Sequence, residues 1–273
     1  MASVGFEEAR SDARGGASAR AGSFSVWPER FRDVVDVLAS IVALVVLSPL
    51  LLIVAIVTKL DSPGPVLFRQ ERIGRNRRRN GSPTVHEGSE RRRRDIYGRP
   101  FAFYKFRTMF ADSSSRFPHL YDYSHRKDDL RSLPIKMLMA KRAEAHIGQA
   151  IHSWPKEALQ GDDPRLTRSG RWLRRTSLDE LPNLFNVLTG DMHLVGPRPD
   201  IAENIRHYQP HELRILDVKP GVTGLAQVEG RGLLSFDEIN KLDLKYLEAR
   251  SLWVDARILA RTIKELVTAR GAY

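Results

Sequence analysis

The longest run of apolar residues lies near the N-terminus, where Val37 to Thr58 gives 22 consecutive positions without a charged side chain. As an α-helix rising about 1.5 Å per residue, this run is about 33 Å long, close to the ~30 Å hydrocarbon core of a bilayer. It is too long for the apolar region of a signal peptide, and no small-residue cleavage site follows it. The pattern therefore predicts a membrane helix that is retained in the mature protein, which we place at residues 28–61.

A Ser48-Pro49 pair lies in the middle of this run. Because proline removes one helical hydrogen bond and crowds the preceding turn, we expect a kink there. Basic side chains flank both ends, with Arg30 and Arg32 before the run and Lys59 after it, whereas a single crossing favours an excess of Lys and Arg on one side. The pattern fits a helix that enters the membrane, bends and returns to the same face. It also fits an ordinary proline-kinked spanning helix.

The rest of the chain alternates short segments of different periodicity. Residues 1–27 have few large apolar side chains and are interpreted as a flexible tail. One strand-like segment is predicted to begin at residues 65–68 and another at 101–106. Helical segments are predicted within 113–160, over 165–188 and as an amphipathic helix at 252–267. The predicted fold class is therefore mostly α with a few short strands, in which residues 62–273 form one compact domain with insertions at about 75–99 and 113–160.

The composition adds a basic charge that is concentrated in one place. The 273 residues carry a formal charge of +11 and no Cys, which excludes disulfides, a thiol nucleophile and thiolate metal sites. Between Arg72 and Arg94 there are nine Arg against two Glu, giving 9 − 2 = +7. This Arg-rich segment raises the alternative of a membrane-tethered nucleic-acid-binding or scaffold protein. It lacks interleaved aromatics for stacking on bases and shows no recognition helix, so we do not favour that alternative.

The densest cluster of polar residues runs from Arg165 to Asn183. Helical spacing places three of its arginines, Arg168, Arg171 and Arg175, along one side, which suits the binding of phosphate oxygens. Asp179 is a candidate helix N-cap, because Pro182 would then fall at the third helical position, where its missing N–H costs nothing. The alternative is that both residues are only structural. Asp179 would then cap the helix, and Glu180 would interact favourably with the helix dipole in the first turn.

Two later segments add further polar groups. Arg198 lies between Pro197 and Pro199, which fix its backbone and direct its guanidinium. The glycine-punctuated segment from Lys219 to Arg231 includes Thr223 and Gln227, and its glycines suit either a close approach of backbone to a ligand or a turn into a strand.

Taken together, five motifs strongly resemble the bacterial sugar transferase family, the monotopic polyprenyl-phosphate phosphoglycosyl transferases. They are Tyr104 to Met109, Arg174 to Pro182, Gly190 to Met192, Val195 to Pro199 and Pro220 to Gly224. The resemblance implies a re-entrant Ser-Pro membrane helix and a compact cytoplasmic catalytic domain with amphipathic interfacial helices. It also implies the small, catalytic-core form, without the extra N-terminal helices of larger relatives.

The resemblance implies an activity and roles for individual residues. The family reaction transfers a sugar-1-phosphate from a UDP-sugar to polyprenyl (undecaprenyl) phosphate and releases UMP, as the first membrane step of exopolysaccharide or surface-glycan synthesis. Asp179 would be the nucleophile that forms an aspartyl-phosphosugar intermediate, and Asp179 and Glu180 would hold Mg²⁺. The residues expected to bind substrate are Lys105, Arg107, Arg174, Arg175, Arg198, Thr223, Gln227 and Arg231.

The implied setting is the cytoplasmic face of the inner membrane. Expected partners are a UDP-sugar, polyprenyl phosphate and membrane lipid, and a homo-oligomer or downstream glycosyltransferases would be compatible with this chemistry. Nucleic acid is not expected. The identity of the sugar, the role of the insertions and the choice between a re-entrant and a spanning helix stay open at this point.

Overall fold

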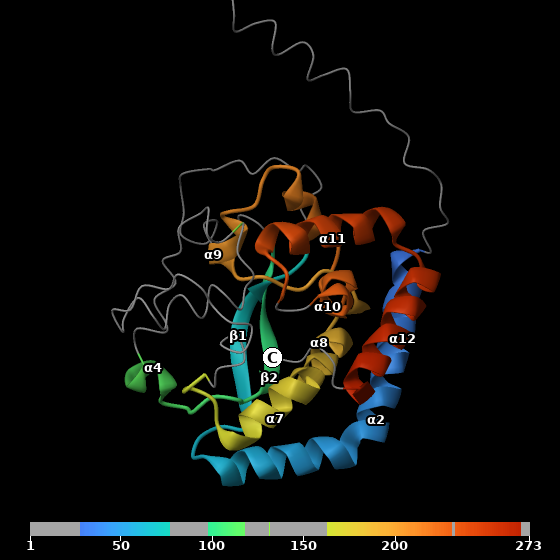
Figure 1. Cartoon of the computed structure of the whole chain (residues 1–273). Helices are drawn as coiled ribbons and strands as arrows, with labels where there is room; N and C mark the ends of the chain where they lie inside the picture. The colour runs from blue at the N-terminus through green and yellow to red at the C-terminus, as the bar shows by residue number, and fades with distance from the viewer. Residues whose placement is uncertain (1–27, 77–97, 118–130, 132–162, 231–232, 269–273) are drawn as a thin grey trace, which may run out of the picture.

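The computed structural model describes residues 28–76, 98–117, 131, 163–230 and 233–268 (Figure 1). In these ranges the fold is mostly helical with two small two-stranded sheets, which confirms the predicted class. The elements, with η for 3₁₀ helices, are α2 (Glu29–Asp61), β1 (Leu67–Ile73), β2 (Pro100–Phe106), α4 (Ser113–Arg116), α7 (Arg168–Thr176), η4 (Leu178–Asn183), α8 (Leu184–Leu188), β3 (His193–Val195), α9 (Ala202–Ile205), η5 (Glu212–Asp217), β4 (Gly221–Thr223), α10 (Leu225–Glu229), α11 (Phe236–Ala249) and α12 (Leu252–Thr268).

The helix α2 contains the apolar run and is the one helix in the described ranges long and apolar enough to cross a membrane. It begins eight residues before the run, because its first turns carry a polar stripe that faces the domain. Arg32, Asp36 and Ser40, spaced four residues apart, are buried, while Val34 and Leu38 on the opposite face are 57% and 58% exposed. The first half of α2 thus has one polar face that packs on the domain and one apolar face that is exposed.

The Ser48-Pro49 pair has a visible local consequence. Pro49 cannot donate to the carbonyl of Val45 four residues earlier, and the Ser48 hydroxyl donates to that carbonyl instead at 2.8 Å. In Figure 1 the ribbon of α2 changes direction within the helix, so that its first half runs beside α12 and its second half runs below α7. The hydroxyl therefore satisfies the polar group that the proline leaves without its helical partner.

Both ends of α2 are bonded to the same domain. At the first end, Arg32 pairs with Asp255 of α12 at 2.7 Å, and Asp36 contacts the buried His193 of β3 at 2.6 Å. At the other end, the Asp61 carboxylate accepts hydrogen bonds from the backbone and hydroxyl of Ser169 at the start of α7, at 2.9 and 2.8 Å.

The sheet of β1 and β2 forms the middle of the domain. The two strands pair in antiparallel register, with Phe68 opposite Lys105. Alternate side chains of β2 point to the core, where Phe101 and Phe103 pack with Val187 of α8 and Met192. A second cluster joins Phe106 of β2 to Val54 of α2 and Leu173 of α7, so the membrane helix shares the core of the domain.

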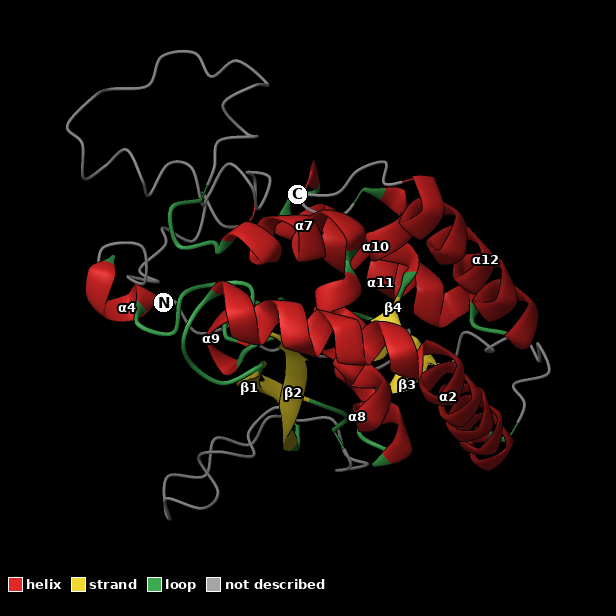
Figure 2. Cartoon of the chain, turned by 90° about the horizontal axis from the view of Figure 1, so that it is seen from below, coloured by secondary structure: helices red, strands yellow, loops and turns green. Residues whose placement is uncertain are grey.

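The predicted helical stretch of residues 165–188 is divided into three pieces, α7, η4 and α8. Figure 2 shows α7 and α8 as separate helices. Ser177 has a left-handed backbone, with φ 54°, and its N–H closes the end of α7 on the Arg174 carbonyl. The next element therefore starts at Leu178, and Asp179 lies inside η4, whose N-cap is Ser177. The prediction that Asp179 is a helix N-cap was wrong, because hydrophobic periodicity does not reveal a left-handed turn at a serine.

Candidate active site

The site is built where η4 packs on the end of β2. The left-handed turn at Ser177 reverses the chain after α7 and presents Asp179 and Glu180 in the first turn of η4. Lys105 comes from β2, and Arg198 comes from the loop after β3. The charges of Glu180 and Arg198 act on the pKa of both Lys105 and Asp179, so sequence segments about 90 residues apart meet in one cluster.

Asp179 is a buried carboxylate, 6% exposed, and it makes no hydrogen bond or ion pair within the described part of the chain. Burial and the neighbouring Glu180 charge raise the pKa of Asp179, and the positive charges of Lys105 and Arg174 oppose them. A buried carboxylate without a partner is costly unless a ligand or reaction uses it. Asp179 is therefore available for chemistry.

Glu180 differs from its neighbour because it is fully engaged. The Arg198 guanidinium donates to both of its carboxylate oxygens, at 2.6 and 3.1 Å, in the fork geometry that arginine and carboxylate share. Burial acts to raise the pKa of Glu180, but the charge and hydrogen bonds of Arg198 outweigh it and hold the pKa below its ordinary value. The two adjacent carboxyl groups thus have pKa values shifted in opposite directions.

Arg198 owes its position to the backbone around it. The N–H of Gly221 donates to the Pro197 carbonyl at 2.8 Å, and Arg72 of β1 donates to the Pro199 carbonyl at 3.2 Å. A Cβ on Gly221 would collide with the backbone N of Gly196. The glycines of this segment therefore permit a close approach of backbone to backbone, which braces the turn that carries Arg198.

Lys105 lies between the carboxylates and an aromatic ring. Its ammonium is 5.5 Å from the centroid of the Phe68 ring on the paired strand, within range of a cation–π contact. Burial and the positive charge of Arg174 lower the pKa of Lys105 to about 8, although Asp179 and Glu180 favour the charged form.

The arginines of α7 do not all face the Asp179 cluster. Arg174 is half-buried, and its Nε donates to the Thr108 hydroxyl at 3.1 Å. The Arg174 guanidinium also lies close enough to Asp179 for its positive charge to oppose the rise in the pKa of that carboxyl. Arg168 and Arg175 are exposed on the helix surface. The structure thus brings Arg174 to the cluster and leaves Arg175, which was also expected to bind substrate, on the outside of α7.

Arg107 has a different place from the one expected. It is 4% exposed, and its guanidinium donates to the carbonyls of Thr58, Ser62 and Pro63 at the C-terminal end of α2, at 3.1 and 2.7 Å for the first two. These carbonyls have no helical partners, so a buried cation is well placed to satisfy them. The side chain thus holds the end of the membrane helix instead of facing Asp179.

The segment after β4 likewise turns its polar groups inward. The Thr223 hydroxyl shares a hydrogen bond of 2.8 Å with Thr262 of α12, and the Gln227 amide reaches the Val222 carbonyl at 3.5 Å. These contacts join β4 and α10 to their neighbours, and no described contact brings either side chain to Asp179. Arg231 lies outside the described residues, as does most of the 75–99 and 113–160 insertions.

Arg72 is a residue of the site that the sequence motifs did not single out. Besides bonding the Pro199 carbonyl, its guanidinium lies 3.8 Å from the Asp200 carboxylate and 5.6 Å from the Phe103 ring centroid. Arg72 lies in β1 opposite Phe101 of the apolar strand β2. A charged side chain in such a position needs a polar or charged partner, and this requirement could have pointed to Arg72.

The carboxylates suit a divalent cation that binds together with its substrate. No group of three or more His, Cys, Asp and Glu side chains able to hold a metal gathers in the described ranges. However, Mg²⁺ uses one or two carboxylates plus substrate phosphates, and a cation would relieve the repulsion by which Glu180 raises the pKa of Asp179. The donor set fits Mg²⁺ carried in with a phosphate ligand.

Comparison with known proteins gives consistent matches over most of the chain. Residues 27–82 and 88–269 match the family described as bacterial sugar transferase. The galactosyl transferase CpsE of Streptococcus agalactiae is 36% identical over 77% of this chain and 36% of its own length. The undecaprenyl-phosphate glucose phosphotransferase of Komagataeibacter xylinus is 35% identical over 91% of this chain and 38% of its own length.

A third relative is matched over more of its length. The UDP-glucose:undecaprenyl-phosphate glucose-1-phosphate transferase of Caulobacter vibrioides is 35% identical over 89% of this chain and 72% of its own length. The chain thus spans less than two fifths of the first two relatives and most of the third.

Proposed function

The chain belongs to the bacterial sugar transferase family, and from this membership we propose that it transfers a sugar-1-phosphate from a UDP-sugar to polyprenyl phosphate, releasing UMP. The observation that carries the proposal is Asp179, a buried carboxylate without a partner that lies beside three cations. An ionised carboxylate needs no base to activate it, so it suits nucleophilic attack on a phosphorus whose negative charge is neutralised.

The reaction proceeds in two displacements. An oxygen of Asp179 attacks the phosphorus that bears the sugar, the bond from that phosphorus to the bridging oxygen breaks, and UMP leaves. A phosphate oxygen of the polyprenyl acceptor then attacks the same phosphorus, and the bond to Asp179 breaks, which restores the carboxylate. Burial, which raises the pKa of Asp179, also strengthens it as a nucleophile when it is ionised.

The neighbouring cations have separate tasks in this proposal. Lys105 and Arg174 face the nucleophile and neutralise the phosphate that it attacks, while Arg198 shifts from Glu180 to substrate phosphate oxygens when the substrate enters. Mg²⁺, held by Glu180 and Asp179 with the diphosphate, would supply further charge neutralisation of the leaving group.

The acceptor is a lipid, so the reaction requires a membrane surface. We propose that α2 is re-entrant and that the domain lies on the cytoplasmic face of the inner membrane. This topology is supported by the bonds at both ends of α2: Arg32 with Asp255 at one end and Asp61 with Ser169 at the other, all within one domain. A spanning helix would place its ends on opposite faces of the bilayer.

The decisive experiment measures UMP release and labelled lipid from membranes that contain the full chain. UDP-glucose and UDP-galactose are the first donors to test, since relatives named for glucose and galactose transfer match the chain. Asp179→Asn should lose nearly all turnover and all sugar-phosphate attached to the protein. Asp112→Asn, which changes an exposed carboxylate paired with Arg116, is the matched control. Near-normal turnover of Asp179→Asn would refute the mechanism.

Topology has its own test. Tags at the two ends of the chain should both be accessible from the cytoplasm only. Tags on opposite faces of the membrane would contradict the re-entrant helix.

A further inference from the structure

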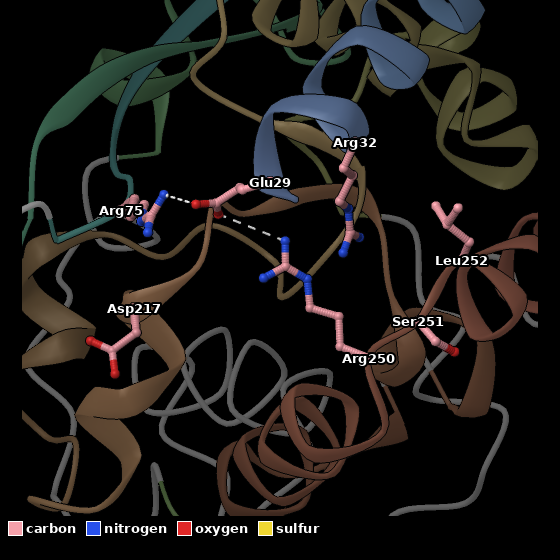
Figure 3. A pocket seen from close by; sticks show the side chains of 7 residues that line it. All are labelled: Glu29, Arg32, Arg75, Asp217, Arg250, Ser251 and Leu252. Atoms are coloured by element: carbon pink, nitrogen blue, oxygen red, sulfur yellow. Dashed lines mark hydrogen bonds and ion pairs between the residues drawn. The ribbon is translucent and has the colours of Figure 1, made fainter. Parts of the chain in front are cut away.

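A polar pocket of about 170 Å³ opens at the first turn of α2 (Figure 3). Its walls come from four separate parts of the chain. They are Glu29 and Arg32 on α2, Arg75 after β1, Asp217 at the end of η5, and Arg250, Ser251 and Leu252 at the junction of α11 and α12. The pocket shares no residue with the Asp179 cluster, and the reaction proposed above gives it no role.

The arginines of this pocket differ in how completely they are paired. Arg32 is engaged, since its guanidinium bonds Asp255 at 2.7 Å and Tyr246 at 2.6 Å. Arg75 holds Glu29 at 2.5 Å. Arg250 lies 3.8 Å from the same Glu29 carboxylate and makes no hydrogen bond in the described part of the chain, although its side chain is only 15% exposed. One carboxylate is therefore shared by two guanidinium groups.

The positive charge of Arg250 is thus only partly balanced, by a carboxylate that it shares with Arg75. Burial and the nearby Arg32 lower the pKa of Arg250. In Figure 3 its guanidinium extends into the middle of the pocket, between Glu29 and Arg32. An anionic ligand would complement the Arg250 guanidinium, because the carboxylate nearest to it, Glu29, is shared with Arg75.

The pocket lies at the border between the lipid-facing surface and the polar domain. Val34, five residues after Glu29, is 57% exposed, which at about 1.5 Å per residue puts lipid-facing side chains about 8 Å from the pocket along the helix axis. Trp253, next to the pocket at the start of α12, is 71% exposed, and tryptophan favours the headgroup level of a bilayer. Basic pockets at this depth bind lipid headgroups.

We propose that this pocket binds the phosphate of an anionic phospholipid headgroup, with Arg250 and Arg75 as its ligands. A lipid phosphodiester has one negative charge and offers acceptor oxygens to the Arg250 guanidinium. On binding, the phosphate takes the free donors of Arg250 and leaves Glu29 to Arg75. A phosphate monoester or a nucleotide diphosphate carries more negative charge and would be repelled by Glu29 and Asp217.

The test measures lipid binding by the full chain in neutral detergent micelles. Short-chain phosphatidylglycerol is titrated, and the bound lipid is counted by native mass spectrometry, with phosphatidylcholine as the uncharged reference. Arg250→Gln and Arg75→Gln should each weaken phosphatidylglycerol binding about fivefold, which corresponds to about 1 kcal/mol per basic residue. Arg257→Gln is the matched control, because Arg257 lies on α12 outside the pocket lining and is exposed beside Trp253. It should bind like the wild type.

Arg250→Lys keeps the charge and should restore part of the affinity, which separates loss of the ligand from loss of folding. Equal weakening in Arg257→Gln would mean a general charge effect and would overturn the proposal, as would unchanged binding in both pocket variants. Displacement of the lipid by inorganic phosphate at similar concentration would assign the pocket to soluble phosphates and overturn the lipid assignment. The measurement involves no turnover, so its outcome is independent of the sugar-phosphate transfer.

Discussion

Arg107 offers the sharpest test of how the sequence motif and the structure differ. The motif suggests a substrate ligand, whereas the guanidinium is buried against the carbonyls of Thr58, Ser62 and Pro63. Replacing Arg107 by Met keeps the length of the side chain and removes all three bonds. A hydrogen bond to a charged group contributes about 1.5–3 kcal/mol, and such contributions are not additive. We therefore expect Arg107→Met to lower the free energy of unfolding by about 3–5 kcal/mol, a large part of the 5–15 kcal/mol typical of a domain.

The assay is urea unfolding in detergent, followed by tryptophan fluorescence, together with the KM for the UDP-sugar in the fraction that remains folded. Arg107→Lys retains a charged donor and should recover part of the stability. Gly64→Ala should act in the same direction, because Gly64 has φ of 125° and an added Cβ would lie 2.6 Å from the Arg107 Nη1. If Arg107→Met raised KM and left unfolding unchanged, the guanidinium would be a substrate ligand and our reasoning would be wrong.

Three further predictions concern the site and the membrane helix. Because the pKa of Lys105 is lowered from 10.5 to about 8, its ammonium is lost as pH rises through 8, and turnover should fall there. The unfolded chain still holds that proton up to about pH 10, so the stability, followed by unfolding at each pH, should rise between pH 8 and 10. Gly170→Ala should lower the free energy of unfolding by about 1–3 kcal/mol, since its Cβ would collide with the Thr108 carbonyl at the contact of α7 with the end of β2. Ser48→Ala removes the hydroxyl that satisfies the Val45 carbonyl and should cost about 1 kcal/mol in the same denaturation assay.

The elements that periodicity predicts best are those with one continuous apolar face. The predicted strand at residues 101–106 and the amphipathic helix at 252–267 correspond to β2 and α12 within two residues at each end. The membrane run was also recognised, but its helix begins at Glu29 because buried ion pairs stabilise the polar turns before Val37. Such pairs depend on partners more than 150 residues away, which no local pattern contains.

The Asp179 cluster could also be predicted only in part, because local spacing does not reveal how the chain turns between its elements. Spacing in the sequence favoured Arg168, Arg171 and Arg175 as one row, yet the left-handed Ser177 turns the chain so that Arg174 faces the carboxylates. Motif resemblance named Arg174 and Arg198, because it reflects the folded site as well as the local helix. It also named Arg107, and motifs do not separate residues that contact substrate from those that hold neighbouring elements.

Contacts at the C-terminal end of α2 connect this helix directly to the Asp179 cluster. Arg107, which holds the end of α2, is two residues after Lys105. Asp61 binds the first turn of α7, and the last turn of that helix carries Arg174. Any change in the depth or angle of α2 would therefore move the two cations that face Asp179. In the function we propose, the acceptor has its phosphate at the membrane surface, so a rigid joint between α2 and these cations would keep Asp179 at the height where that phosphate lies.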